Sequence, residues 1–88
     1  MNTFPKIQEV TPLPGKRLLV KFKNNIKKIY DCLPLLDDSN FKALLDDGLF
    51  RSVRADRHGY GVSWNDKLDL SESELWMNGA FLDQSKTV

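Results

Sequence analysis

The chain has 88 residues, a net charge of +1, 41% hydrophobic residues and 10% aromatic residues. A chain of this length forms one small domain with a thin hydrophobic core, and its composition excludes a disordered protein. Its single cysteine, Cys32, excludes an intrachain disulfide, and no apolar stretch approaches the roughly 18 residues of a membrane span. The N-terminal MNTFPKIQEV lacks the apolar run of a signal peptide, so we expect residues 1–88 to form a cytoplasmic domain.

Residues 6–31 predict three short strands separated by turns. The first strand covers residues 6–11, and the second covers residues 17–23, where apolar residues alternate with polar ones. The third strand covers residues 26–31. The first turn contains Pro12, Pro14 and Gly15, which are typical turn residues.

The second turn fixes which side chains share a face of this hairpin. Asn24-Asn25 suits a two-residue loop, because asparagine tolerates a positive φ angle. This loop would pair Val20 with Ile29. One face would then hold the core residues Leu18, Val20, Phe22 and Ile29. The other face would expose Leu19, Lys21, Lys23, Lys28 and Tyr30, with Lys21 directly opposite Lys28.

Residues 32–50 predict a turn followed by one helix. Asp37, Asp38 and Ser39 suit a helix N-terminus, where a side-chain oxygen can accept from a free backbone amide. Gly48 suits the C-terminal stop. The apolar stripe of this helix consists of Phe41, Leu44 and Leu45.

The C-terminal part predicts a second hairpin and a short helix. The hairpin bends at Arg57-His58-Gly59 and carries apolar residues along residues 53–64. Ser71 followed by Glu74 forms a capping box, which predicts a helix from Glu72 to about Asn78. Trp76 is available to dock this helix. We expect residues 79–88 to form a loose tail, in which Phe81 and Leu82 can still pack.

The order of these signals resembles a small bacterial family known as domain of unknown function 2442 (DUF2442). The resemblance covers about residues 5–77 and rests on LLVKF, Tyr30-Asp31, LPLL, Leu49-Phe50 opening a strand, a glycine-containing turn, Trp64, and Asp69-Leu70. It implies an α+β fold in which small antiparallel strands, including two hairpins, pack with two or three short helices. It implies no activity. Some relatives are fused to, or encoded near, helix-turn-helix or other small uncharacterised proteins. By analogy, this suggests an accessory or regulatory role.

The sequence contains no recognisable catalytic, cofactor or metal motif. Cys32 follows Asp31 in an apolar context typical of a buried structural cysteine, and His58 lies in a hairpin bend. One cysteine and one histidine exclude a zinc site of the usual spacing within the chain. The paired carboxylates are expected to cap a helix, at Asp37-Asp38, or to be solvated, at Asp46-Asp47. We therefore expect no enzyme, cofactor or metal.

The basic hairpin face is the strongest functional candidate. Residues 1–30 carry seven basic residues and one acidic residue, whereas the remainder is acidic overall. This asymmetry indicates either an anionic partner or attraction between the two halves. The candidate interaction surface comprises Arg17, Lys21, Lys23, Lys28, Tyr30 and, if exposed, Trp76.

Two functions fit this surface. The leading hypothesis is a non-enzymatic protein–protein interaction or accessory module with a protein partner or a second copy of itself. The alternative is a nucleic-acid-binding regulatory domain, in which lysines hold the backbone and Tyr30 stacks on a base. Lysines on an exposed strand also protect a sheet from aggregation, which requires no partner.

Overall fold

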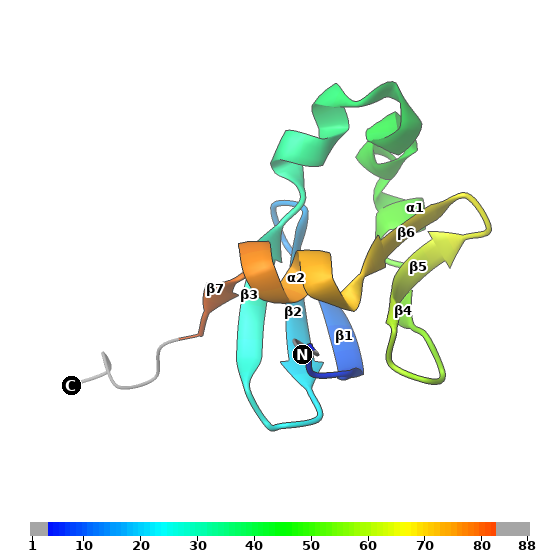
Figure 1. Ribbon diagram of the computed structural model, residues 1–88. Helices are drawn as coiled ribbons and strands as arrows, with labels where there is room; N and C mark the ends of the chain where they lie inside the picture. Colours follow the sequence, from blue (N-terminus) through cyan, green and yellow to red (C-terminus); the bar gives the residue numbers. More distant parts are fainter. Residues whose placement is uncertain (1–3, 83–88) are drawn as a thin grey trace.

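Two antiparallel sheets joined by short helices make up the computed structural model, which describes residues 4–82 (Figure 1). The sheets have the strand orders β1-β2-β3-β7 and β4-β5-β6. The strands are β1 (Ile7–Leu13), β2 (Arg17–Phe22), β3 (Lys27–Asp31), β4 (Arg54–Ala55), β5 (Gly61–Asn65), β6 (Leu68–Ser71) and β7 (Ala80–Phe81). The helical elements are the 3-10 helices η1 (Leu33–Asp37) and η2 (Ser39–Leu45) and the α-helices α1 (Asp47–Phe50) and α2 (Glu72–Asn78). The α+β prediction is confirmed.

The β2–β3 hairpin has a three-residue loop, Lys23–Asn25, and not the predicted loop of two. The Phe22 amide donates to the Ile26 carbonyl at 2.9 Å, and the Asn25 amide donates to the Phe22 carbonyl at 2.9 Å. Asn25 has a φ angle of 70°, the left-handed conformation that closes three-residue hairpin loops. The strands consequently pair Val20 with Lys28.

This one-residue shift exchanges the two faces of β3, because side chains alternate along a strand. Lys28 and Tyr30 face the core, and each is only 5% exposed. Ile29, which was predicted to be buried in the core, lies on the opposite face and is half-buried. The predicted register was therefore wrong, and so was the predicted exposure of Lys28 and Tyr30.

Strand β1 is longer than predicted and includes Pro12. Proline lacks an amide donor, and β1 tolerates it because this strand lies at the edge of its sheet. The register shifts between Ile7 and Glu9. A register shift of this kind inserts one extra residue into β1. It turns Ile7 and Val10 toward the same face, although they lie three positions apart. Both residues thereby join the core.

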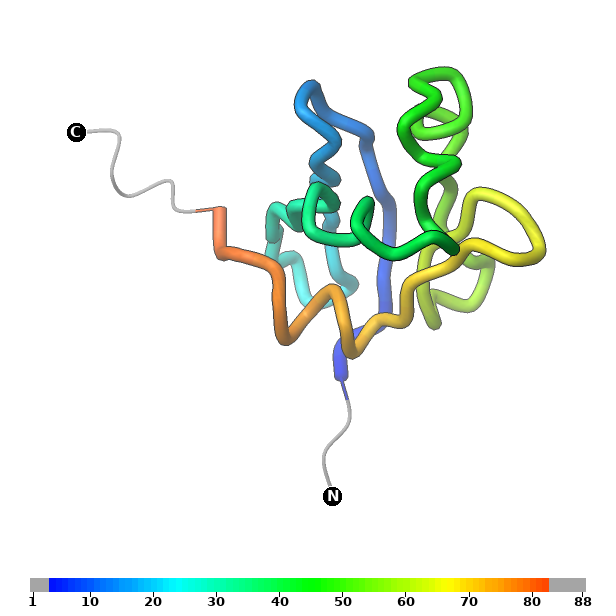
Figure 2. Tube along the Cα trace, turned by 90° about the horizontal axis from the view of Figure 1, so that it is seen from above, coloured from blue at the N-terminus to red at the C-terminus, as the bar shows by residue number. Residues whose placement is uncertain are grey.

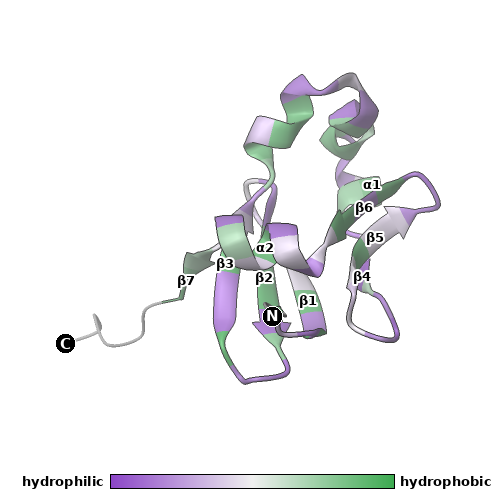
Figure 3. Cartoon of the chain, in the orientation of Figure 1, coloured by the Kyte–Doolittle hydropathy of each residue, from purple (hydrophilic) through white to green (hydrophobic). Residues whose placement is uncertain are grey.

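The core lies between the two sheets, α2 and the helical segment before α1. Figure 3 shows apolar residues along β2 and β6 and hydrophilic residues at the hairpin loops. Trp64 is 5% exposed, and its Nε1 donates to the Phe50 carbonyl at 3.0 Å. The fully buried side chains include Leu18, Val20, Phe22, Cys32, Leu44 and Leu75.

The segment from 33 to 50 forms η1, η2 and α1 in place of one continuous helix. The Asp38 side chain accepts from the Asn40 amide and caps η2. The Asp46 side chain accepts from the Leu49 amide, so that a new helix begins at Asp47. Each carboxylate caps the first turn of a new helix, so the chain changes direction at that residue. Gly48 lies inside α1 and ends no helix, and Leu49-Phe50 belongs to α1 and opens no strand.

The final helix matches its prediction. α2 spans Glu72–Asn78, and the Ser71 hydroxyl accepts from the Glu74 amide at 3.1 Å. The expected loose tail is wrong for β7, which pairs antiparallel with β3. The remainder of that tail, residues 83–88, lies outside the described residues.

Candidate functional site on the outer face of the four-stranded sheet

The four-stranded sheet separates the six predicted surface residues into two groups. Lys28, Tyr30 and Trp76 lie on the side that α2 covers. The remaining residues lie on the opposite face or in the adjacent loop: Arg17, Lys21 and Lys23. The structure therefore does not bring the six predicted residues together in one site.

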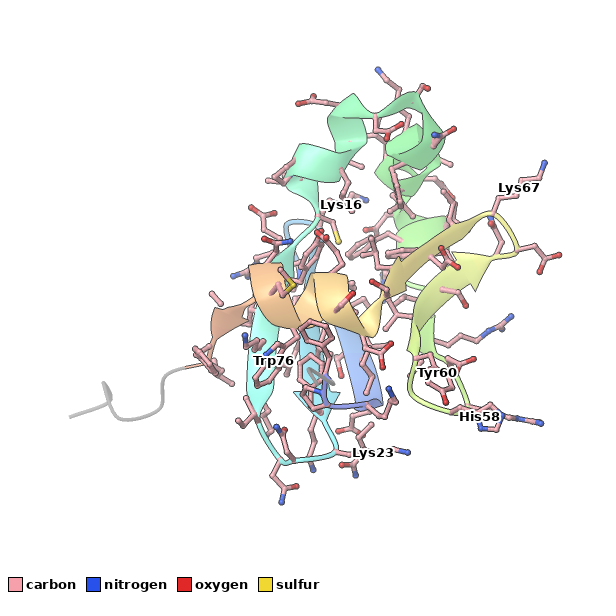
Figure 4. All side chains as sticks on the ribbon, in the orientation of Figure 1. Lys16, Lys23, His58, Tyr60, Lys67 and Trp76 are labelled. Carbon is pink, nitrogen blue, oxygen red and sulfur yellow. The ribbon has the colours of Figure 1, made fainter. Side chains whose placement is uncertain are left out.

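The Lys28 side chain contacts both α2 and β7 and so connects them to the sheet. Its Nζ donates to the Trp76 backbone carbonyl and lies 4.0 Å from the Trp76 ring centroid and 4.2 Å from that of Phe81. Burial lowers the pKa of Lys28. A desolvated lysine over aromatic rings stabilises the fold by about 2 kcal/mol. Figure 4 shows Trp76 between α2 and the strands, where it also packs edge-on against Phe22. These contacts assign Lys28 and Trp76 to packing.

Tyr30 also holds α2. Its hydroxyl donates to the Glu74 carboxylate at 2.7 Å. Burial and this hydrogen bond raise the pKa of Tyr30. One of the two hydrogen bonds of the capping box is formed, from the Glu74 amide to the Ser71 hydroxyl. The Glu74 carboxylate, which would make the other, accepts from Tyr30. A tyrosine bonded in this way is unavailable to stack on a nucleic-acid base.

We call the face of the four-stranded sheet opposite α2 the outer face. Its residues form rows across the strands, and the strand register determines which residues share a row. Leu19 and Ile29 form a paired apolar centre, extended by Thr11 on β1 and Ala80 on β7. The two flanking rows are Glu9, Lys21 and Lys27 on one side, and Leu13, Arg17 and Asp31 on the other. Leu19 and Ile29 are half-buried. Within residues 4–82, the helix that packs against β3 is α2, which crosses the other face (Figure 1).

The outer face carries basic side chains without ion-pair partners among residues 4–82. The ion pairs in this part of the chain are Lys6–Glu72, Lys16–Asp47 and Arg51–Asp47. The first two join the basic N-terminal part to the acidic remainder, so the charge asymmetry is partly satisfied within the fold. Four basic residues have no carboxylate within ion-pair distance among residues 4–82: Arg17, Lys21, Lys23 and Lys27. Lys21 lies directly opposite Lys27.

Two hollows flank the first sheet at different ends. One, of about 450 Å³, lies beside the basic row and is lined by Asn25, Ile26, Lys27, Phe81 and Leu82. The other, of about 420 Å³, lies between the β1–β2 turn and α1, which stand side by side in Figure 2, and is lined by Pro12, Leu13, Pro14, Asp47 and Arg51. Lys16 bridges these two segments, with its Nζ 3.6 Å from Asp47 Oδ1.

A third hollow, of about 390 Å³, lies over the second sheet. Three of the residues that line it are aspartates: Asp56, Asp66 and Asp69. The Asp56 carboxylate is occupied locally, because it accepts from the amides of His58 and Tyr60 and shapes the bend. These backbone hydrogen bonds lower the pKa of Asp56.

Cys32 and His58 lie in different surroundings. Cys32 is fully buried, as predicted, and burial raises the pKa of its thiol to about 12. His58 is exposed in the β4–β5 bend, also as predicted (Figure 4). Of the predicted capping aspartates, Asp38 caps a helix. Asp46, expected to be solvated, also caps one.

Residues 4–82 contain no group of three or more histidine, cysteine or carboxylate side chains arranged to hold a metal ion. None of the helices in this part of the chain has the length and apolarity needed to cross a bilayer.

Sequence reasoning placed Leu19 on the exposed face of the hairpin but left it out of the interaction surface, and it missed Ile29 and Lys27 as members of the outer face. The exposure of Ile29 and Lys27 depends on the β2–β3 register. The local signal that could have found them is the residue before Asn24-Asn25, because a three-residue loop closed by Asn25 is as compatible with the sequence as a two-residue loop.

One protein family matches this chain by sequence. Its description is "Protein of unknown function (DUF2442)", and the match covers residues 7–80. The chain is a DUF2442 protein. The resemblance drawn from LLVKF, Tyr30-Asp31 and Trp64 is thereby confirmed. No curated protein and no solved structure matches this DUF2442 chain. The family description assigns no activity, so the function of this DUF2442 protein has to be argued from its surface.

Proposed function

We propose that this DUF2442 protein is a non-enzymatic interaction module that binds a protein partner through the outer face of its four-stranded sheet. The observation that carries this proposal is the apolar pair Leu19 and Ile29 at the centre of that face. An apolar centre surrounded by charged residues has the anatomy of a protein–protein interface. An accessory role in the cytoplasm fits such a module.

The register favours a protein partner over nucleic acid. Single-strand binding needs aromatic side chains on which bases can stack. Tyr30, the aromatic residue expected on this face, is bonded to Glu74 on the other side of the sheet. Ile29 takes its place, and an aliphatic centre is better suited to apolar side chains of another protein.

The remaining chemistry supports a non-enzymatic role. Acid–base and nucleophilic catalysis need groups that converge on a substrate. Cys32 is enclosed in the core, and burial raises the pKa of its thiol to about 12, whereas a reactive cysteine needs a lowered pKa. His58 lies exposed at the β4–β5 bend.

Affinity capture from host lysate tests the proposal when wild type is compared with an outer-face variant. Leu19→Thr/Ile29→Thr removes the apolar centre and keeps strand-compatible residues. The control is Leu33→Ser/Leu45→Ser, which removes two exposed apolar side chains from the 3-10 segment, 52% and 62% exposed. Thermal melts establish that all three proteins are folded.

The proposal predicts that wild type and control retain the same protein after nuclease treatment, and that the outer-face variant loses it. Equal retention by the outer-face variant would refute the proposed surface. Retention that disappears on nuclease treatment would instead support the nucleic-acid alternative.

A further inference from the structure

The charges of the outer face are concentrated at one end of the sheet. The row of Glu9, Lys21 and Lys27 lies next to the β2–β3 loop, which adds Lys23. The row at the other end pairs Arg17 with Asp31 and is neutral. The end near the loop therefore carries a net positive charge, and the neutral end carries none.

Lys21 and Lys27 form a like-charge pair across β2 and β3. Like charges directly opposite each other destabilise a sheet. Neither lysine has a carboxylate within ion-pair distance among residues 4–82, and Glu9, the register neighbour of Lys21, makes no ion pair with it. An anion that contacted both ammonium groups would turn this repulsion into two attractive interactions.

A hollow at the edge strand β7 adjoins Lys27 of this pair. Lys27 lines it together with Asn25, Ile26, Phe81 and Leu82. Phe81 pairs with Lys28 and therefore lies on the α2 side, so the hollow opens at the edge of the sheet, next to the outer face. Phe81 is 63% exposed and Leu82 is 37% exposed. An apolar side chain entering this hollow would lie next to an anion held by Lys27, so the site combines a charged and an apolar contact.

From this combination we infer that the occupant of the outer face is an acidic segment of a partner protein. The segment places a carboxylate between Lys21 and Lys27 and continues to the sheet edge at β7, where a large apolar side chain enters the hollow of Ile26, Phe81 and Leu82. This inference rests on the proposed function, because it names the partner of the same surface. A second copy of the chain would bring the same positive end against itself or against the neutral end. A nucleic-acid backbone would satisfy the lysines and leave the apolar contacts unused.

Peptide selection on the full-length protein tests the inference. Random peptides of about 14 residues span the outer face either as a helix or in extended form, since β1, β2 and β3 are five to seven residues long. Peptides displayed on phage are selected on immobilised wild type, and the enriched sequences are synthesised. Their Kd values are measured by fluorescence anisotropy at several salt concentrations.

We expect enriched peptides with a net negative charge and a large apolar residue close to an aspartate or glutamate. Lys21→Gln/Lys27→Gln should weaken their binding about tenfold and reduce its salt dependence. Leu82→Ser should weaken binding without changing the salt dependence. The matched control is Lys42→Gln/Lys67→Gln, which removes two exposed lysines elsewhere (Lys67 is labelled in Figure 4) and should leave the Kd unchanged.

Each other outcome overturns the inference in a distinguishable way. Peptides that need Leu19 and Ile29 but tolerate Lys21→Gln/Lys27→Gln would refute the acidic segment and leave the proposed function intact. Absence of any enriched peptide that needs the outer face would count against both. A dimer broken by Leu19→Thr/Ile29→Thr would assign a second copy as the occupant. DNA or RNA binding lost in the lysine variant would assign nucleic acid.

Discussion

Tyr30→Phe tests the register of the β2–β3 hairpin, on which the composition of the outer face depends. In the structure this change removes the 2.7 Å hydrogen bond from the Tyr30 hydroxyl to the Glu74 carboxylate. A hydrogen bond to a charged group contributes about 1.5–3 kcal/mol. Glu74 is half-buried and regains part of its hydration, so we expect the free energy of unfolding to fall by about 1–2 kcal/mol. For a domain of this size, the melting temperature should fall by about 5–15 °C.

Urea denaturation followed by circular dichroism measures this change against a matched control. Tyr60→Phe removes the same hydroxyl from a side chain that is 57% exposed, and its effect should stay within about 0.5 kcal/mol. In a Glu74→Ala background the cost of Tyr30→Phe should shrink, because its partner is already absent. If Tyr30→Phe costs no more than Tyr60→Phe, Tyr30 is solvent-exposed and the register described here is wrong.

Three further predictions concern single positions. Ser71→Ala removes the cap of α2 and should lower the free energy of unfolding by about 1 kcal/mol in urea denaturation. Gly61→Ala would place a Cβ 2.3 Å from the Leu70 carbonyl oxygen and should cost about 3 kcal/mol or more, whereas Gly48→Ala, with its nearest atom 3.6 Å away, should cost nothing. The thiol pKa of Cys32 rises from 9.0 to about 12 on folding, so the unfolded state loses this proton first. Wild-type stability should therefore fall as pH rises from 9 toward 12, and thermal melts of Cys32→Ala should show a shallower fall.

The elements predicted correctly are those that local chemistry determines. The alternation of Leu18, Val20 and Phe22 identified β2 and its buried face, because a period of two is specific to a strand. Ser71 followed by Glu74 located the start of α2 to the residue, because the N-terminal amides of a helix need an acceptor.

The elements predicted incorrectly depend on long-range contacts or on a choice between two equivalent local structures. Asn24-Asn25 permits loops of two or three residues, and core packing selects the one that buries Tyr30. The short strand β7 depends on the contact between Phe81 and Lys28, which are far apart in the sequence. The split of the predicted helix at Asp46 follows from a side-chain cap that competes with helix continuation.

The candidate site was predicted only in part for the same reason. Arg17 and Lys21 were placed correctly on the face of β2 opposite its core residues, because side chains alternate along a strand, and Lys23 lies in the adjacent loop. Lys28 and Tyr30 were exchanged for Lys27 and Ile29 by a one-residue shift in register. The shift alters the chemistry of the outer face from an aromatic residue to an aliphatic centre.

Lysine acetylation read by tandem mass spectrometry tests both the β2–β3 register and the outer face as the interaction surface in one experiment. In the free protein, Lys27 should react and the adjacent Lys28 should be protected. In complex with the captured partner, Lys21 and Lys27 should lose reactivity while Lys42 and Lys67 keep theirs. Equal reactivity of Lys27 and Lys28 in the free protein would contradict the register. Protection of Lys42 and Lys67 with Lys21 and Lys27 still reactive would contradict the outer face as the interaction surface.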